Sequence, residues 1–233
     1  MVERDPSPPG LRASSRTQLR RKRERDRSDW DTVTSILDEG LLCHVGFADE
    51  TGTYVVPMAY ARVGDVLYLH GAAGNRTLRA LAAGAEACVT VTLLDGLVLS
   101  RSAFHHSVNY RSVMLLGRAA PVVDEDEQRA AATALLDHLI PGRSKDARPP
   151  VDSELRSTLM LRLPLEEGSA KVRTGPPADD PEDMALPIWA GEIPVRLVAD
   201  PPVPDPDLQD GVATPNYATD PRRPGWTGGR SRR

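Results

Sequence analysis

The chain has 233 residues, 40% of them hydrophobic, which suits one domain with tails or two small domains at most. Its formal net charge of -4 gives no global indication of nucleic-acid binding. It contains no apolar run of membrane-spanning length, no signal-peptide core and no CxxC pair, so we expect a cytoplasmic protein without a membrane segment or a structural zinc site.

The two ends of the chain differ from its middle in composition. Residues 1–27 are charged and punctuated by proline and glycine, so we predict a disordered basic arm there. A folded domain should follow over 28–200, and 201–233 should be a disordered, proline-rich tail. The run RTQLRRKRERDR (16–27) could contact nucleic acid or an anionic surface. Acidic residues interrupt it and no aromatic residues interleave with it, so a solvated arm is favoured.

The folded part begins with a helix and then changes to the period of β-strands. The helix is predicted in SDWDTVTSILDEG, where Ser28 or Asp29 can cap the start and Gly40 stops it. The Asp95-Gly96 dipeptide predicts a hairpin turn between two strands. The predicted strands are LLCHVGFA (41–48), TYVVPMAYARV (53–63), VLYLHG, ACVTVTLL (87–94), LVLSRSAF (97–104) and NYRSVMLLGRAAPVV (109–123).

The later part of the domain adds a second substantial helix and more strands. Asp124 can cap the helix DEDEQRAAATALLDHLIPG. Beyond it, DSELRST reads as a helical turn, and LMLRLPLEE and SAKVRTG read as strands. The short strands, tight turns and few helices predict a mainly β protein with peripheral helices, folded as a small antiparallel β-barrel. A doubly wound sheet would need a helix between most successive strands.

The stretch LYLHGAAGNRTLRAL (67–81) predicts a strand, a glycine turn and a short helix. Amide groups at a helix start suit a phosphate, and Gly71 and Gly74 let the backbone approach a ligand. Asn75 can cap the helix, and Arg76 adds a forked cation. The pattern is neither GxGxxG nor a Walker loop. From spacing alone it is either a phosphate site or a plain connection between a strand and a helix.

Other residues that could take part in binding or catalysis lie on the predicted strands or at their ends. His70 stands where the strand meets the glycine turn; it could hydrogen-bond to a ring or transfer a proton, or it could serve packing or capping. On a strand, Arg111 and Val113 face one side, while Tyr110 and Ser112 face the other. Burying Arg111 requires an anionic partner; otherwise it lies in solvent on an edge strand.

The sequence contains no motif for a protein nucleophile, so any chemistry would come from a bound cofactor. Adjacent side chains on a strand point to opposite faces, so His105 and His106 predict no metal site. Lys171, Arg173 and Trp189 could close a pocket or simply cover the end of the barrel.

The order of the segments YVVPMAYAR, LYLHGAAGNRTLRAL, SVNYRSV, SAKVRTG and IWAGEIP resembles that of the pyridoxamine 5'-phosphate oxidase-like flavin-binding proteins. Within them the chain is most similar to the branch that includes the nitroimidazole-resistance proteins, and the resemblance covers about 28–195. It implies a split β-barrel, a homodimer, and FMN in a groove between the two subunits.

The resemblance also implies roles for individual residues. His70 becomes the candidate catalytic residue, and Lys171, Arg173 and Trp189 lie where substrate contacts are expected. The substrate-binding Arg and His of true pyridoxamine phosphate oxidases have no counterpart here, so vitamin B6 oxidation is not expected. The cofactor-binding residues implied are Pro57, Met58, Ala59, Tyr60, His70, Gly71, Asn75, Arg76, Tyr110, Arg111 and Ser112.

Three functional hypotheses follow, in falling order of preference. The first is an FMN-dependent oxidoreductase that passes hydride or electrons to or from a small molecule such as a nitro compound. The second is a flavin- or haem-binding protein without turnover, in which His70, His105 or His106 ligates iron. The third is a protein that binds nucleic acid through its basic ends.

Overall fold

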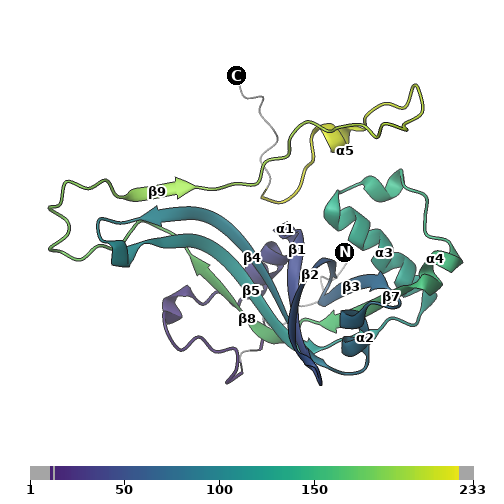
Figure 1. Cartoon of the computed structure of the whole chain (residues 1–233), viewed down its shortest axis with the longest axis horizontal. Coiled ribbons are helices and arrows are strands. Elements are labelled where there is room, and N and C mark those ends of the chain that lie inside the picture. The colour runs from purple at the N-terminus through teal and green to yellow at the C-terminus, as the bar shows by residue number, and fades with distance from the viewer. Residues whose placement is uncertain (1–10, 13, 226–233) are drawn as a thin grey trace, which may run out of the picture.

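The computed structural model describes residues 11, 12 and 14–225, and its strands form one curved antiparallel sheet (Figure 1). Among these residues the strand order is β6-β7-β3-β2-β1-β4-β5-β8, with β9 paired to β4. The strands are β1 (Leu42–Asp49), β2 (Gly52–Val63), β3 (Val66–Ala72), β4 (Glu86–Leu99), β5 (Ser107–Arg118), β6 (Ala120–Pro121), β7 (Thr158–Pro164), β8 (Glu167–Arg173) and β9 (Gly191–Pro194). This is the mainly β split-barrel architecture predicted from the sequence.

The helices are short and lie at the ends and on one side of the sheet (Figure 1). Asp29, Asn75 and Asp124 cap the first three α-helices, each accepting a hydrogen bond from the backbone N–H three residues later, as predicted. The helices are η1 (Arg23–Arg25), α1 (Trp30–Glu39), α2 (Arg76–Ala82), η2 (Ala103–His105), α3 (Glu125–Leu139), η3 (Arg143–Lys145), α4 (Asp152–Ser157) and α5 (Asn216–Thr219).

The predicted hairpin turn at Asp95-Gly96 is wrong. β4 continues through this dipeptide, and the pairing with β5 shifts register between Leu94 and Gly96, which is a β-bulge. The turn comes at η2 instead, so Leu97 lies opposite Val108. An Asp-Gly pair suits a bulge as well as a turn, and the long pairing with β5 decides between them. As a result, β4 and β5 project from the barrel as a long two-stranded arm (Figure 1).

One face of the sheet encloses the main hydrophobic core. Val89 and Val91 of β4 and Val113 and Leu115 of β5 point into it and are almost fully buried. Because side chains alternate along a strand, the residues between them face the other way. Helices α1 and α2 also pack into this core, through Leu37 and Leu78 among others, as do buried residues of β1, β3 and β7.

The other face of the sheet has two parts that differ in cover. On the first, which we call the covered half, α3 packs over β3, β7 and the end of β2 through Leu135, Tyr68 and Met160. On the second, the open half, the outward side chains of β1, the start of β2, β4 and β5 face solvent. Leu42 is 54% exposed there and Val55 is 65% exposed.

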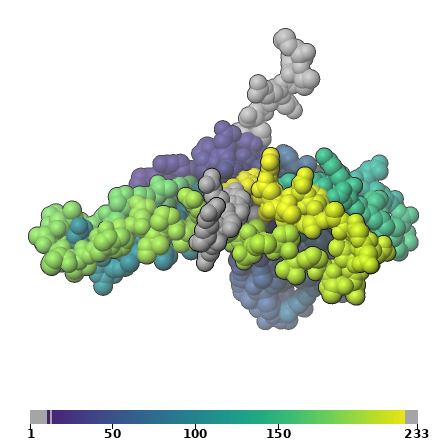
Figure 2. All heavy atoms as spheres, turned by 90° about the horizontal axis from the view of Figure 1, so that it is seen from above, coloured from purple at the N-terminus to yellow at the C-terminus, as the bar shows by residue number. Residues whose placement is uncertain are grey.

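Both ends of the described chain lie against the barrel. The stretch before α1 runs beside β8 (Figure 1). Its backbone forms a parallel β-bridge between Arg12 and Glu167 and an antiparallel one between Asp26 and Lys171. The segment after β9 runs above α1 toward α3 in Figure 1, and Figure 2 shows its atoms on top of the molecule. The domain boundaries 1–27, 28–200 and 201–233 stay a prediction.

Arg223 and Tyr217 attach the C-terminal segment to the domain, and Tyr217 accepts a hydrogen bond from Arg143 at 2.7 Å. The Arg223 guanidinium donates to the Leu139 carbonyl at 2.9 Å, and it lies 3.4–3.5 Å from the carbonyl oxygens of Asp38, Glu39 and Gly40. It thus places a positive charge at the C-terminal ends of both α3 and α1, where helix dipoles favour cations. No helix within the described ranges is both long and apolar enough to cross a membrane.

Candidate functional site

The open half brings several of the predicted site residues onto one surface. Pairing places Ala59 opposite Leu42, and Thr92 opposite Ser112, which in turn lies opposite Lys171. Directly paired residues of a sheet point to the same face. Five strands therefore present neighbouring side chains on a surface that is apolar near β1 and polar near β8.

His70 stands at the border between the covered half and the open half. It lies opposite Met160, which α3 buries, while the His70 side chain itself keeps access to solvent. Packed protein around the ring desolvates it and lowers the pKa of His70, so the neutral imidazole is the form present at pH 7. A neutral imidazole donates a hydrogen bond from one nitrogen and accepts one at the other.

The turn between β3 and α2 has a structural role, whether or not it also binds a ligand. A Cβ on Gly71 would lie 3.0 Å from Leu78 Cδ1, so this glycine lets α2 pack closely on β3. A Cβ on Gly74 would meet open space. Asn75 uses its side chain to cap α2, as described above.

Arg76 has protein partners of its own. Its guanidinium binds the Asp49 carboxylate at 2.9 Å, contacts the Thr51 hydroxyl and lies 4.1 Å from the centre of the Tyr54 ring. These contacts tie α2 to the turn between β1 and β2. The phosphate role implied for Arg76 stays a prediction. To bind a phosphate, the guanidinium would have to divide its N–H donors between the phosphate and Asp49.

The two faces predicted for Tyr110, Arg111 and Ser112 are the faces observed. Tyr110 and Ser112 belong to the open half, and Arg111 points to the opposite side, where it meets two carboxylates. Its N–H groups donate to Glu39 at 2.5 and 2.8 Å and to Asp95 at 2.8 and 3.0 Å. The pair of hydrogen-bonded anions raises the pKa of Arg111. Arg111 is therefore paired with anions, as predicted for an arginine that is buried.

A groove of about 620 Å³ opens beside this ion-pair cluster. Its floor is the edge of β4 with Glu39 and Arg111, and its outer wall is the segment that follows β9. Sequence reasoning missed it because its walls come from stretches that are distant in the chain and carry no shared motif. The lining residues are Glu39, Thr92, Leu93, Leu94, Asp95, Arg111, Pro194, Val195, Arg196, Leu197 and Gly225.

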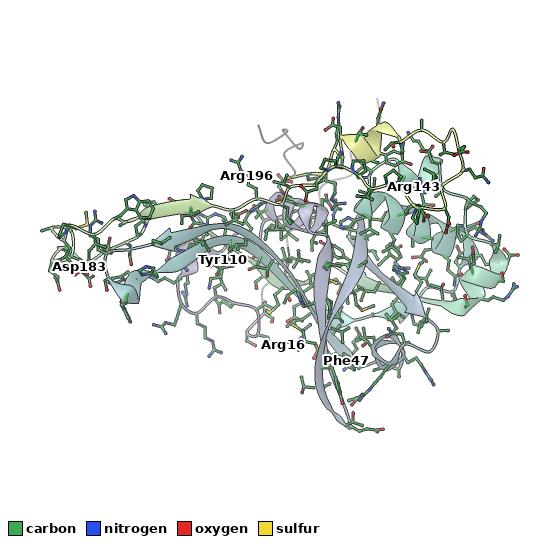
Figure 3. All side chains as sticks on the ribbon, turned by 45° about the horizontal axis from the view of Figure 1, so that its top comes forward. Arg16, Phe47, Tyr110, Arg143, Asp183 and Arg196 are labelled. Carbon is green, nitrogen blue, oxygen red and sulfur yellow. The ribbon has the colours of Figure 1, made fainter. Side chains whose placement is uncertain are left out.

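The paired histidines lie at the tip of the arm, far along β4 and β5 from His70. His105 Nε2 is 3.1 Å from the Asp180 carboxylate. His106 Nδ1 is 3.0 Å from the Ser102 carbonyl oxygen and 3.2 Å from Ser100 Oγ. Asp183, labelled at the far end of the arm in Figure 3, belongs to the loop that connects β8 with β9.

The three predicted substrate residues are not brought together with His70. Lys171 reaches the open half beside Ser112, without a carboxylate partner among the described residues. Arg173 contacts the Asn109 side chain and the Gly175 carbonyl. Trp189 lies just before β9 on the arm, 64% exposed.

The residues of the open half suit a flavin ring in two respects. The exposed apolar side chains of Leu42 and Val55 can cover the ring, and the neutral imidazole of His70 can hydrogen-bond to it. The implied ring contacts divide between two environments. Pro57 and Ala59 are accessible, whereas Met58 and Tyr60 are buried in the core, so only the backbone of those two could touch a ligand.

Comparisons with known proteins give one family and several similar structures. The family model described as pyridoxamine 5'-phosphate oxidase matches residues 29–172. The flavocytochrome Anf3 from Azotobacter vinelandii is 43% identical, with a TM-score of 0.82 over 87% of this chain and 94% of that one. No match was found among curated proteins.

Two further solved structures are also similar to this chain. The FAD- and haem-binding protein from Mycobacterium smegmatis is 36% identical, with a TM-score of 0.79 over 82% of this chain and 94% of that one. A putative 5-nitroimidazole antibiotic resistance protein from Bacteroides thetaiotaomicron is 27% identical, with a TM-score of 0.54 over 63% of this chain and 86% of that one.

The coverage of these matches differs in the C-terminal part. A match over 87% of 233 residues omits only about 30 of them, so the flavocytochrome match includes residues 173–203 wherever it begins. The match of 63% can end within the family region. The segment that carries β9 and the outer wall of the groove is thus shared with the flavocytochrome.

Proposed function

The chain belongs to the pyridoxamine 5'-phosphate oxidase family, and on this premise we propose that it binds a flavin and a haem and acts as an oxidoreductase toward a small molecule. The observation that carries the proposal is the 43% identity to a flavocytochrome over 94% of that protein, continuing past the family region into the segment with β9. The flavin would supply hydride or electron transfer, and the haem would supply single-electron transfer.

The flavin site in this proposal is the open half. Its ring would lie against β2 near Pro57 and Ala59, with His70 at the edge as a proton donor to the reacting molecule. The lowered pKa of His70 keeps the ring mainly neutral at pH 7, so it would take up a proton from solvent before passing it to the reacting molecule. The resemblance of the core implies FMN, and a nitro compound is one candidate electron acceptor.

The haem ligand in this proposal is His106. Its Nδ1 faces the Ser102 carbonyl, and an imidazole that donates Nδ1–H to a backbone carbonyl keeps the Nε2 lone pair free for a metal. Apolar side chains that could contact a macrocycle are exposed nearby, among them Phe104 and Val108. His105 has its Nε2 on the Asp180 carboxylate, which leaves it the weaker candidate.

A homodimer is part of the same proposal. Exposed apolar side chains continue along one face of the arm, where Ile193, Leu97 and Val108 lie opposite one another on β9, β4 and β5. Covering this face and the open half with a second copy would remove it from water. Light scattering after gel filtration should give twice the mass of the chain, and a monomer at micromolar concentration would contradict this part.

An absorption spectrum of the purified protein tests the cofactors. We expect flavin bands together with a Soret band. The His106→Ala variant should lose the Soret band and keep the flavin, whereas His70→Ala should keep both cofactors and lose turnover with a nitro compound or another acceptor. A colourless protein that shows no thermal shift with FMN, FAD or haemin would remove the proposal.

A further inference from the structure

We propose that a basic surface at the outer edge of the sheet is the docking site for a small acidic electron-carrier protein, which supplies the electrons that this protein passes on. The inference rests on the proposed function, because only an oxidoreductase needs such a donor. The surface, which we call the basic edge, joins the loop before α1 to the neighbouring strand β8. Its cations are Arg20, Arg21, Lys22, Arg23, Arg25, Lys171 and Arg173.

The charge of the basic edge is opposite to that of the whole chain. Residues 20–27 contain six Lys/Arg against Glu24 and Asp26, a net charge of +4 in a chain whose formal net charge is -4. The side chains of 20–23 are exposed. Among the described residues before α1, only Arg16, which Figure 3 labels, forms an ion pair with a carboxylate. The cations of the basic edge are therefore available to an anion from outside the chain.

Strand β8 holds the loop of the basic edge at both of its ends. Before the loop, the Ser14 hydroxyl donates to the Glu167 carboxylate and Thr17 is buried. After the loop, the Arg27 N–H donates to the Ala170 carbonyl at 3.1 Å. Figure 1 shows the loop, in purple, standing out beside β8 between these attachments. A surface that is ordered before binding loses less conformational entropy when a partner docks.

The basic edge continues from the loop onto the sheet and toward the arm. Burial lowers the pKa of Arg173, and the nearby charge of Arg25 lowers it further, so loop and strand form one positive surface. Arg173 lies opposite Tyr110, about 14 Å along β5 from the proposed haem ligand His106. A docked partner would therefore deliver electrons near this end of the arm. In each encounter the partner loses one electron and this protein gains one, with no bond formed or broken.

The residues among and around these cations favour an acidic protein over nucleic acid or a membrane. Glu24 and Asp26 interrupt the row of cations and would repel a continuous phosphate backbone. Among the described residues before β1, no large apolar side chain is exposed that could stack on bases or enter lipid. Interfaces between electron-transfer proteins are small, and complementary charge speeds their encounter. A charged loop of this size suits such an interface.

Calorimetric titration of the full-length protein with a plant-type [2Fe–2S] ferredoxin tests the inference. We expect an affinity in the micromolar range at about 20 mM salt and binding at least about tenfold weaker at about 200 mM, because salt screens the charges. Arg21→Gln, Lys22→Gln and Arg23→Gln combined should weaken binding about tenfold at low salt. The initial rate at which reduced ferredoxin changes the flavin and Soret bands of the protein should fall by a similar factor.

The matched control makes the same change in net charge at three exposed cations far from the basic edge in sequence. It combines Arg79→Gln, Lys145→Gln and Arg156→Gln, and it should keep the affinity for ferredoxin within about twofold. Glu24→Gln gives a signal of the opposite sign. It removes an exposed carboxylate from the loop and should tighten binding about twofold, a gain that misfolding cannot produce.

Several outcomes would overturn the inference. The first is no binding at low salt, or an equal loss of affinity in the two triple variants. The second is tighter binding to duplex DNA or to phosphatidylglycerol vesicles that the basic-edge variant loses. The third is a changed mass of that variant in light scattering, which would assign the surface to a second copy of the chain.

The same measurements separate the inference from the function beneath it. A protein that carries flavin and haem and does not bind ferredoxin would remove the inference and leave the proposed function intact. A protein that holds neither cofactor would remove both.

Discussion

The covered half and the open half belong to the same face of one sheet, and they differ in what their outward side chains touch. On β3, Tyr68 packs under α3 and its hydroxyl donates to Glu127 at 2.7 Å. Two residues further along the same strand, His70 has lost that cover and faces solvent. No helix covers the outward face of β4 and β5 among the described residues, and Leu94 is 46% exposed. The outward apolar side chains of the covered half pack against α3 and stabilise the fold. Those of the open half stay accessible to a ligand.

The contrast teaches that cover by α3 decides which outward side chains of this sheet stay accessible. The alternation along β4 and β5 is regular, so neighbouring residues of similar chemistry have different roles. Four changes should sharpen or break this comparison, beginning with the largest expected effect.

Replacing a leucine on the two faces should give opposite results. Leu115→Ala empties a site that is 1% exposed, so it should lower the free energy of unfolding by about 2–5 kcal/mol. Leu94→Ala removes a side chain already in water and should change it by about 0.5 kcal/mol at most, in the free monomer. Urea unfolding measures both. Equal losses would mean that the open half is packed in solution.

Removing Arg111 should cost less than a core leucine and more than an ordinary surface pair. Arg111→Ala leaves Glu39 and Asp95 facing each other without their cation, and we expect a loss of about 2 kcal/mol. The control is Arg62→Ala, which breaks a single pair with the half-exposed Asp38 and should cost about 1 kcal/mol or less. If the two variants lose the same stability, the cluster at the groove is not a stronger unit than a surface pair.

Acid should weaken the covered half through His138. Its ring lies beside Tyr60, with Nε2 2.7 Å from the Gly40 carbonyl, and burial together with the nearby Arg223 lowers the pKa of His138. A histidine with a lowered folded pKa binds its proton more readily when unfolded, so stability should fall as pH drops below the usual value of 6.5. His138→Gln should show a flatter decline between pH 7 and pH 5 than the exposed control His44→Gln. A parallel decline would assign the acid sensitivity to other groups.

The thiols of Cys43 and Cys88 should react with a labelling reagent at different rates, a difference that needs no substitution to measure. Burial raises the pKa of the Cys43 thiol to about 12, and it also raises that of Cys88, which faces the open half with partial access to solvent. A thiol reagent at neutral pH should label Cys88 slowly and Cys43 only after unfolding. The proposed dimer should slow labelling of Cys88 further. Labelling of Cys43 first, in native buffer, would reverse the assignment of the two faces.

Local patterns predicted most of the fold because they determine it. Apolar periodicity and cap residues such as Asp29 and Asp124 gave helices and strands at nearly their observed places. The Asp95-Gly96 dipeptide failed because a turn and a bulge need the same local backbone freedom, and only the pairing with β5 distinguishes them. The strand β9 has no strong pattern of its own and exists through its pairing with β4.

The site was less predictable than the fold, and for a physical reason. The alternation rule placed Tyr110 and Arg111 on opposite faces, but no local signal indicated that Glu39 and Asp95 would meet Arg111. The cation predicted at the α2 turn, Arg76, has its partner on the distant turn that holds Asp49. The roles of His70 and the other implied ligand contacts remain predictions, because they depend on a resemblance and not on contacts within the chain.

The stretch beside β8 has a consequence for how the chain should be handled. Arg12 exchanges two backbone hydrogen bonds with this strand, and Leu11 is buried against Gly168, where a Cβ would meet the Met114 carbonyl at 2.4 Å. An uncovered outer strand invites a strand from another molecule. Expression from residue 28, the boundary that composition suggests, should therefore yield a folded but self-associating product, whereas the chain that keeps this stretch guards its own sheet edge against aggregation.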